Sequence, residues 1–148
     1  MSRVIRKEKV STDYVAELKS KEENEPIADF LKMKLLEISP GYAKVSMTVL
    51  PEHQNFNGFT FGGIIGAVAD QAFAYGSNSL AFPSVASQFN LHFIAGAKVG
   101  DELIAECRVI QNGRKVGISE MTVTNQDGKL LAKATGTTIP LSAQKPTP

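Results

Sequence analysis

The chain has 148 residues, enough for one globular domain with a single hydrophobic core. Its formal net charge of +1 excludes a general electrostatic attraction to nucleic acid or to an anionic membrane surface. Cys107 is the only cysteine, so no disulfide can form within the chain, which fits a reducing cytoplasm.

Residues 1–25 are rich in charge and are expected to form a solvated arm or a short helix. Val15 and Leu18 lie three positions apart, as on one face of a short surface helix. The basic N-terminus lacks the apolar core of a signal peptide. No uncharged apolar run approaches the roughly 20 residues that a membrane helix needs, so we expect a cytoplasmic protein without membrane contact.

The next elements alternate between regular structure and loop. Pro26 is suited to the first position of a helix that reaches residue 31. A turn is expected at 39–41. Alternating apolar residues then predict a half-buried strand over 42–50. Residues 51–63, PEHQNFNGFTFGG, contain two asparagines and three glycines and are expected to form a loop.

The segment IIGAVADQAFAYGSNSL that follows predicts a long helix, starting at residue 64. Only Asp70 and Gln71 interrupt its apolar character before Ser77. A helix that is apolar on nearly all faces is expected to be buried.

Four strands are predicted after Pro83. One face of the first carries Val85, Phe89, Leu91 and Phe93. The other three are expected at about 102–111, 115–125 and 129–139, because Asn112-Gly113 and Asp127-Gly128 are strong hairpin signals. Residues 141–148 are expected to be a disordered tail.

This order predicts an α+β domain over residues 26–140, with an antiparallel sheet wrapped around the long central helix. Asp70 is the leading candidate for chemistry. A carboxylate in an apolar wall is costly to ionise unless it is paired, hydrogen-bonded or functional. It can serve as a general base or a nucleophile on an acyl group, and the structural alternative is a loop cap or a pair with a basic side chain.

Gly62 and Gly63 lie where the loop meets this helix. The first amides of a helix lack internal partners and can hold an oxygen on which negative charge develops; the structural alternative is a tight turn. Asn55 and Asn57 can orient a water or a carbonyl, or can simply form the turn. His53, His92 and Cys107 have no metal-site spacing, so no metal is expected.

Helix geometry separates the two candidate groups. Asp70 comes seven to eight residues after the glycines, or about 11 Å along a helix that rises 1.5 Å per residue. An aspartate side chain cannot span that distance. If both groups serve one site, they come from two chains, as in a dimer with antiparallel helices.

Residues 55–63, NFNGFTFGG, followed by six residues and then Asp70, resemble hotdog-fold thioesterases of the phenylacetic-acid-degradation (PaaI-like) type. The pattern of that family is an Asn, a Gly, then His-Gly-Gly and a helix with Ala-Asp near its middle. The resemblance also includes Val49-Leu50-Pro51 and the stretch 90–93, and extends over about residues 26–139.

The resemblance implies a hotdog fold and a homodimer, often paired into a tetramer. It implies metal-free hydrolysis of acyl-CoA thioesters, with no cofactor and with coenzyme A as part of the substrate. By the same likeness Asp70 is the base or nucleophile, the Gly62 amide polarises the carbonyl, and Asn55 positions water or substrate. The residues expected to contact the substrate are Gly63, Phe61, Asn57, Phe73 and Gln88.

Phe61 departs from the family pattern, because many members have His before the glycine pair. A phenyl ring cannot hydrogen-bond the thioester, although it can line an apolar acyl pocket. This difference leaves a second hypothesis, an acyl-CoA binding or sensing protein that does not turn over. A hotdog hydratase or dehydratase is a third, but those enzymes carry a His near their Asp, and none lies near Asp70.

Overall fold

The computed structural model describes residues 14–141. The first 13 residues of the expected arm, and all but Leu141 of the expected tail, lie outside these described residues. Residues 14–22 are helical, which matches the helix predicted from Val15 and Leu18. The elements that follow are α2 (Pro26–Leu31), β1 (Lys34–Ser39), β2 (Tyr42–Thr48), η1 (Pro51–His53), α3 (Gly62–Asn78), β3 (Ser84–Phe93), β4 (Glu102–Asn112), β5 (Gly117–Thr124) and β6 (Leu130–Pro140).

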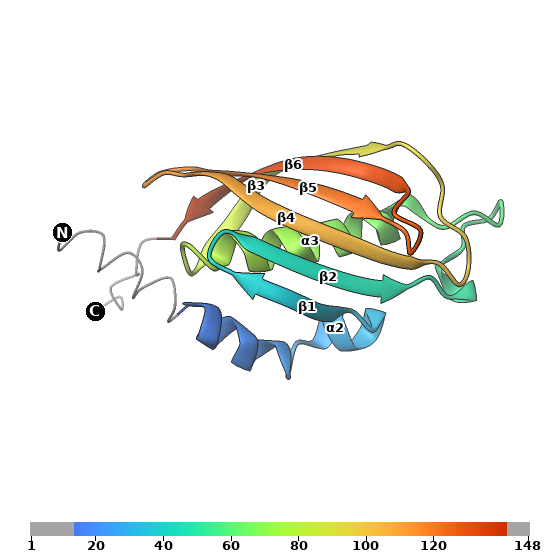
Figure 1. Ribbon diagram of the computed structural model, residues 1–148, viewed down its shortest axis with the longest axis horizontal. Coiled ribbons are helices and arrows are strands. Elements are labelled where there is room, and N and C mark those ends of the chain that lie inside the picture. Colours follow the sequence, from blue (N-terminus) through green and yellow to red (C-terminus); the bar gives the residue numbers. More distant parts are fainter. Residues whose placement is uncertain (1–13, 142–148) are drawn as a thin grey trace.

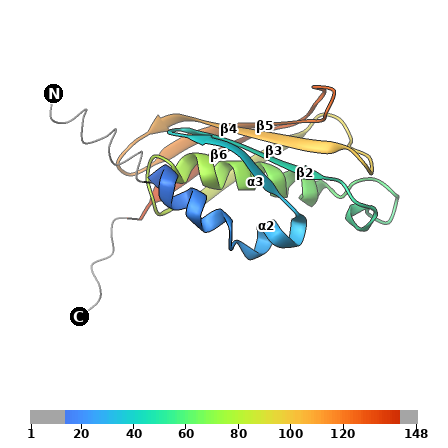
Figure 2. The same ribbon diagram turned by 60° about the horizontal axis from the view of Figure 1, so that its bottom comes forward.

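The strands form one antiparallel sheet in the order β1-β2-β4-β5-β6-β3, with α3 packed along one face (Figures 1 and 2). The expected α+β hotdog architecture is therefore confirmed. β3 follows α3 in the chain but pairs with β6 at one edge of the sheet. β1 forms the other edge.

The core lies between the sheet and α3. Alternate residues of the central strands point inward and are fully or almost fully buried, among them Val45, Leu103, Ala105 and Met121. Burying each large aliphatic side chain contributes about 1.5–3 kcal/mol, so this interface dominates the stability of the domain. Cys107 is also a core residue, and burial raises the pKa of its thiol to about 12.

The prediction that α3 is buried on all sides is wrong. Gly63, Asp70 and Ala74 are exposed, at spacings that place them on one face of the helix. A single sheet covers only one side of a helix. Because α3 carries small apolar residues nearly all round, its sequence does not indicate which side faces the sheet. We call this stripe the open face of α3.

β1 is a strand that the sequence did not reveal. Its register with β2 shifts between Leu35 and Glu37, so a β-bulge interrupts the alternation of apolar and polar residues. Leu36 is consequently exposed beside the half-buried Leu35. A pattern search with period two does not detect a strand broken in this way.

The helical segment 14–22 lies beside β1 (Figure 1). Leu18 is buried, and the Glu22 carboxylate accepts a hydrogen bond of 3.1 Å from the Leu35 amide. This contact satisfies a backbone donor on an edge strand, where unpaired donors invite association with another chain. No helix within residues 14–141 is long and apolar enough to cross a membrane.

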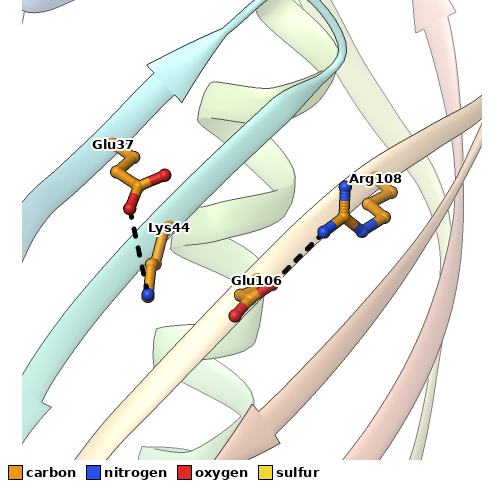
Figure 3. Close-up of polar contacts among 4 residues, drawn as sticks. All are labelled: Glu37, Lys44, Glu106 and Arg108. Atoms are coloured by element: carbon orange, nitrogen blue, oxygen red, sulfur yellow. Dashed lines mark ion pairs between the residues drawn. The ribbon is translucent and has the colours of Figure 1, made fainter.

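The face of the sheet away from α3 carries charged side chains (Figure 3). Lys44 lies 3.9 Å from Glu37, and Arg108 lies 3.7 Å from Glu106. The Arg108 guanidinium also covers the Tyr42 ring at 4.8 Å. Exposed pairs of this kind contribute at most about 1 kcal/mol each. The outer face is therefore polar and gives the fold little of its stability.

Two hairpins join the last three strands. Gly128 has a φ of 78° and closes the turn predicted at Asp127-Gly128, with its amide bonded to the Asn125 carbonyl at 3.0 Å. At the other hairpin β4 continues through Asn112, and the loop spans 113–116. The turn there is two residues later than the Asn112-Gly113 signal indicated.

We expect Gly76→Ala to lower the free energy of unfolding by about 1–3 kcal/mol, because an added Cβ overpacks the core. That atom would lie 2.6 Å from the Cys107 sulfur. Urea denaturation measures the change. Cys107→Ala removes the sulfur, so the double variant should lose less than the sum of the two single variants. If the losses in free energy of unfolding are additive, contact with the Cys107 sulfur is not what excludes a larger residue at position 76.

Candidate active site

The glycine pair forms the N-terminus of α3. Gly62 is the first helical residue, and Phe61 precedes it without a side-chain cap. Among the described residues, no acceptor is found for the Gly62 or Gly63 amide. A Cβ on Gly62 would lie 2.9 Å from the Phe93 ring, so any larger residue would have to displace this ring. Unpaired amides at a helix start are suited to hold an oxyanion, so this role stays a prediction for Gly62 and Gly63.

The loop before α3 is organised by Asn55. Its Oδ1 accepts hydrogen bonds from the backbone amides of Asn57 at 2.9 Å and Phe59 at 3.1 Å. This is the turn-forming role that was the structural alternative for Asn55. The side-chain amide has no partner among the described residues and can still donate to a ligand. The Asn57 side chain is exposed.

His53 is a structural residue of the same loop. It is buried, and its Nδ1 accepts a hydrogen bond of 2.9 Å from the Leu50 amide. Its carbonyl accepts another from the Phe61 amide at 2.8 Å, which fixes the entry into α3. His92 is exposed on β3. Both histidines are more than fifteen positions from Asp70 in the sequence. Residues 14–141 contain no group of three side chains that could hold a metal ion.

Asp70 lies on the open face of α3, without a hydrogen-bond or ionic partner among the described residues. The loop cap and the basic partner that the sequence left open are thus not found in this part of the chain. Partial desolvation raises the pKa of the carboxyl above its usual value. A carboxylate with a raised pKa is a stronger base than an ordinary aspartate, and no internal partner occupies it.

Within one chain, Asp70 and the glycine amides do not meet. α3 is a regular helix from Gly62 to Asn78, so eight residues separate Gly62 from Asp70, or about 12 Å along the axis. Each group is exposed on the same helix, and neither completes the other. Within one chain, the two groups therefore cannot act on the same atom.

Two of the expected substrate contacts do not fit their positions. Phe73 is only 1% exposed and packs in the core against Gly136 and Phe89. Gln88 pairs with Thr137 on the face of the sheet away from α3, since its neighbour Phe89 packs inward against the core. Alternation in β3 separates Gln88 from the open face.

Phe61 does reach the glycine pair. It is 57% exposed, and a Cβ on Gly63 would lie 2.6 Å from its ring. Phe93, also exposed, covers Gly62 from β3. Two aromatic rings therefore frame the helix start. The sequence identified Phe61 by its position in the motif, whereas only the pairing of β3 with β6 brings Phe93 there.

The sequence did not predict a polar cluster that includes Gln71, the residue after Asp70. Glu25 Oε2 accepts hydrogen bonds from the Tyr75 hydroxyl at 2.6 Å and from Gln71 Nε2 at 2.8 Å. Burial, followed by the bond to Glu25, strongly raises the Tyr75 pKa. The spacing of Gln71 and Tyr75 by four residues indicates one helix face, but their partner lies about fifty positions earlier.

Known proteins resemble this chain in sequence and in fold. A family model described as the thioesterase superfamily matches residues 57–132. The acyl-coenzyme A thioesterase PaaI of Escherichia coli is 33% identical over 110 residues, which cover 74% of this chain and 79% of that protein.

Solved structures show the same fold. The structure of the E. coli PaaI protein from the phenylacetic acid degradation operon matches with a TM-score of 0.82 and 27% identity, covering 92% of this chain and 96% of that one. Smu.793 of Streptococcus mutans, solved bound to acetyl CoA, matches with a TM-score of 0.72 and 30% identity. That match covers 76% of this chain and 91% of smu.793.

Asn55→Ala should accelerate hydrogen exchange at the amides of Asn57 and Phe59, because both lose their acceptor. Asn55→Asp is the matched control: it keeps the oxygen but removes the amide donor, so protection should persist. Amide exchange followed by NMR measures both. Equal protection in the two variants would mean that the backbone alone holds the loop.

Proposed function

The chain belongs to the thioesterase superfamily and is a thioester hydrolase, and we propose that it cleaves acyl-CoA thioesters with Asp70 as base or nucleophile. The observation that carries the proposal is the open face of α3. It presents a carboxylate without a partner and two backbone amides without an acceptor. These are the two groups that acyl transfer requires.

The proposed chemistry has two variants. Asp70 either attacks the thioester carbon, forming an anhydride that water then hydrolyses, or removes a proton from a water that attacks instead. In both, the carbonyl oxygen becomes an oxyanion and is held by the Gly62 amide. The carbon–sulfur bond breaks, the sulfur leaves as the thiol of coenzyme A after gaining a proton, and the acid is released.

The distance along α3 supports a site shared by two chains. An antiparallel pair of α3 helices would place Asp70 of one chain level with Gly62 of the other. β3 is the sheet edge suited to such a contact. At the β1 edge, Glu22 caps the backbone of Leu35, whereas β3 exposes both its backbone and the apolar Val85 and Phe93.

The loop that precedes α3 would then reach its partner. If Asp70 is level with the partner's helix start, the loop around Asn55 of each chain lies over the C-terminal half of α3 in the other chain. Phe56 is 97% exposed and Phe59 68% exposed on this loop, as expected for side chains that another chain covers. The Asn55 amide donor would also face the reacting thioester.

Phe61 favours one alternative, an acyl-CoA binding protein that does not turn over. The ring supplies an apolar wall beside the oxyanion position, but no hydrogen bond. The backbone amides and Asp70 are unaffected by that change, so hydrolysis remains the better-supported function. Tight binding of acyl-CoA with no release of thiol would favour the alternative.

We expect Asp70→Asn to abolish thiol release from acyl-CoA while leaving the fold intact. A panel of short, long and aromatic acyl-CoAs, followed by thiol detection, measures this, with circular dichroism as the folding control. Loss of the base or nucleophile should lower kcat by at least about a hundredfold. Full activity in the variant would exclude Asp70 from catalysis.

Subunit mixing tests whether the site is shared. Gly62→Pro removes the amide donor at a helix position where proline is tolerated, and Gly62→Ala keeps it. Mixing inactive Asp70→Asn with inactive Gly62→Pro by unfolding and refolding should restore about a quarter of wild-type activity, because half of the dimers have one intact site. No recovery from subunits that do exchange would mean that each site lies in a single chain.

A further inference from the structure

A second feature of the open face is a cavity of about 610 Å³ near the C-terminal end of α3. Its α3 side is formed by Ala74, Tyr75 and Asn78. Its opposite wall comes from the N-terminal part of the chain, and the loop between α3 and β3 contributes Phe82. The volume lies in the range of small-molecule sites.

The N-terminal wall is fixed to α3. Glu25 binds Tyr75 and Gln71 through the two hydrogen bonds described above, and Leu18 is buried beneath the cavity. Two further lining residues meet each other, because the Lys21 ammonium lies 5.7 Å from the centre of the Phe82 ring. These contacts give the wall a defined position.

The cavity continues from Asp70 along the helix. Ala74 and Asn78 follow Asp70 at intervals of four residues, so the three lie along one face. The cavity therefore begins about 6 Å from Asp70 and extends to about 12 Å. Gln71, the residue after Asp70, is itself bound to the cavity wall.

The lining chemistry distinguishes between the two ends of an acyl-CoA. Leu18, Pro26, Ala74, Phe82 and Pro83 present apolar surface. Among residues 14–141, the lining holds one cation, Lys21, and one carboxylate, Glu25. A nucleotide carries several negative phosphates, which need clustered donors and cations and which a carboxylate repels. An apolar chain needs only the burial that this lining offers.

We propose that this cavity binds the distal part of the acyl group, so that the enzyme acts on medium-chain acyl thioesters. The inference rests on the proposed function, since it places the thioester carbonyl at Asp70. An acetyl group ends before the cavity begins, whereas an octanoyl or decanoyl chain enters it. Leu18 and Phe82 are then specificity-determining residues. They lie on either side of α3 in sequence, and Leu18 lies outside the stretch that matches the family model.

The test compares kcat/KM for acetyl-, butanoyl-, octanoyl- and decanoyl-CoA. Wild type should prefer the longer chains. Ala74→Leu should narrow the cavity and lower the decanoyl-to-acetyl ratio at least about tenfold. Ala16→Leu is the matched control, because Ala16 is exposed on the segment 14–22 but does not line the cavity. Phe82→Ala should move the preference towards longer chains.

A binding measurement separates this inference from the proposed function. S-decyl-CoA, a thioether that cannot be hydrolysed, should bind wild type more tightly than coenzyme A does. Ala74→Leu should remove that difference, as measured by calorimetry. If decanoyl-CoA is hydrolysed but Ala74→Leu affects all chain lengths or both ligands equally, the acyl assignment of the cavity is overturned. If no acyl-CoA is hydrolysed while the thioether advantage persists and depends on Ala74, the cavity assignment stands and the proposed function fails.

Discussion

The packing of α3 against one curved sheet is the constraint on which the rest of the structure depends. The sheet buries one side of the helix in the core and leaves the stripe with Gly63, Asp70 and Ala74 uncovered. A carboxylate on the buried side would need a partner or would stay protonated. On the open side, Asp70 is only partly desolvated, so its pKa is raised but a ligand can still reach the carboxyl group. In the proposed enzyme, stability and catalysis therefore use opposite sides of one helix.

The rise of that helix sets the second constraint. Because Asp70 and the Gly62 amide lie about 12 Å apart on one rigid element, no side-chain rotation within the chain can unite them. In the proposed enzyme, a partner with its helix antiparallel would supply the missing half of each site. In that proposed dimer, the exposed β3 edge and the exposed aromatic residues of the loop before α3 would form one contact surface.

The N-terminal segment adds a different kind of contribution. Its helix satisfies the β1 edge through Glu22 and forms a wall along α3 through Glu25. One short segment thus covers the β1 edge against pairing with a second chain. It also forms a wall beside the C-terminal end of the open face. In the proposed enzyme, catalysis belongs to the helix and its partner, while selection of the acyl group belongs to this wall.

The sequence by itself determined the order of most elements, the antiparallel sheet around a long helix and the motif that joins Gly62 to Asp70, because period-two alternation, turn residues and helix rise are local properties. It missed β1, where a bulge breaks the alternation, and it misjudged Phe73, Gln88 and the burial of α3. Only the tertiary structure decided which side of α3 the sheet covers, that Phe93 frames Gly62, and that Glu25 binds Tyr75. These contacts join residues far apart in the chain, and no local pattern encodes which distant surfaces will meet.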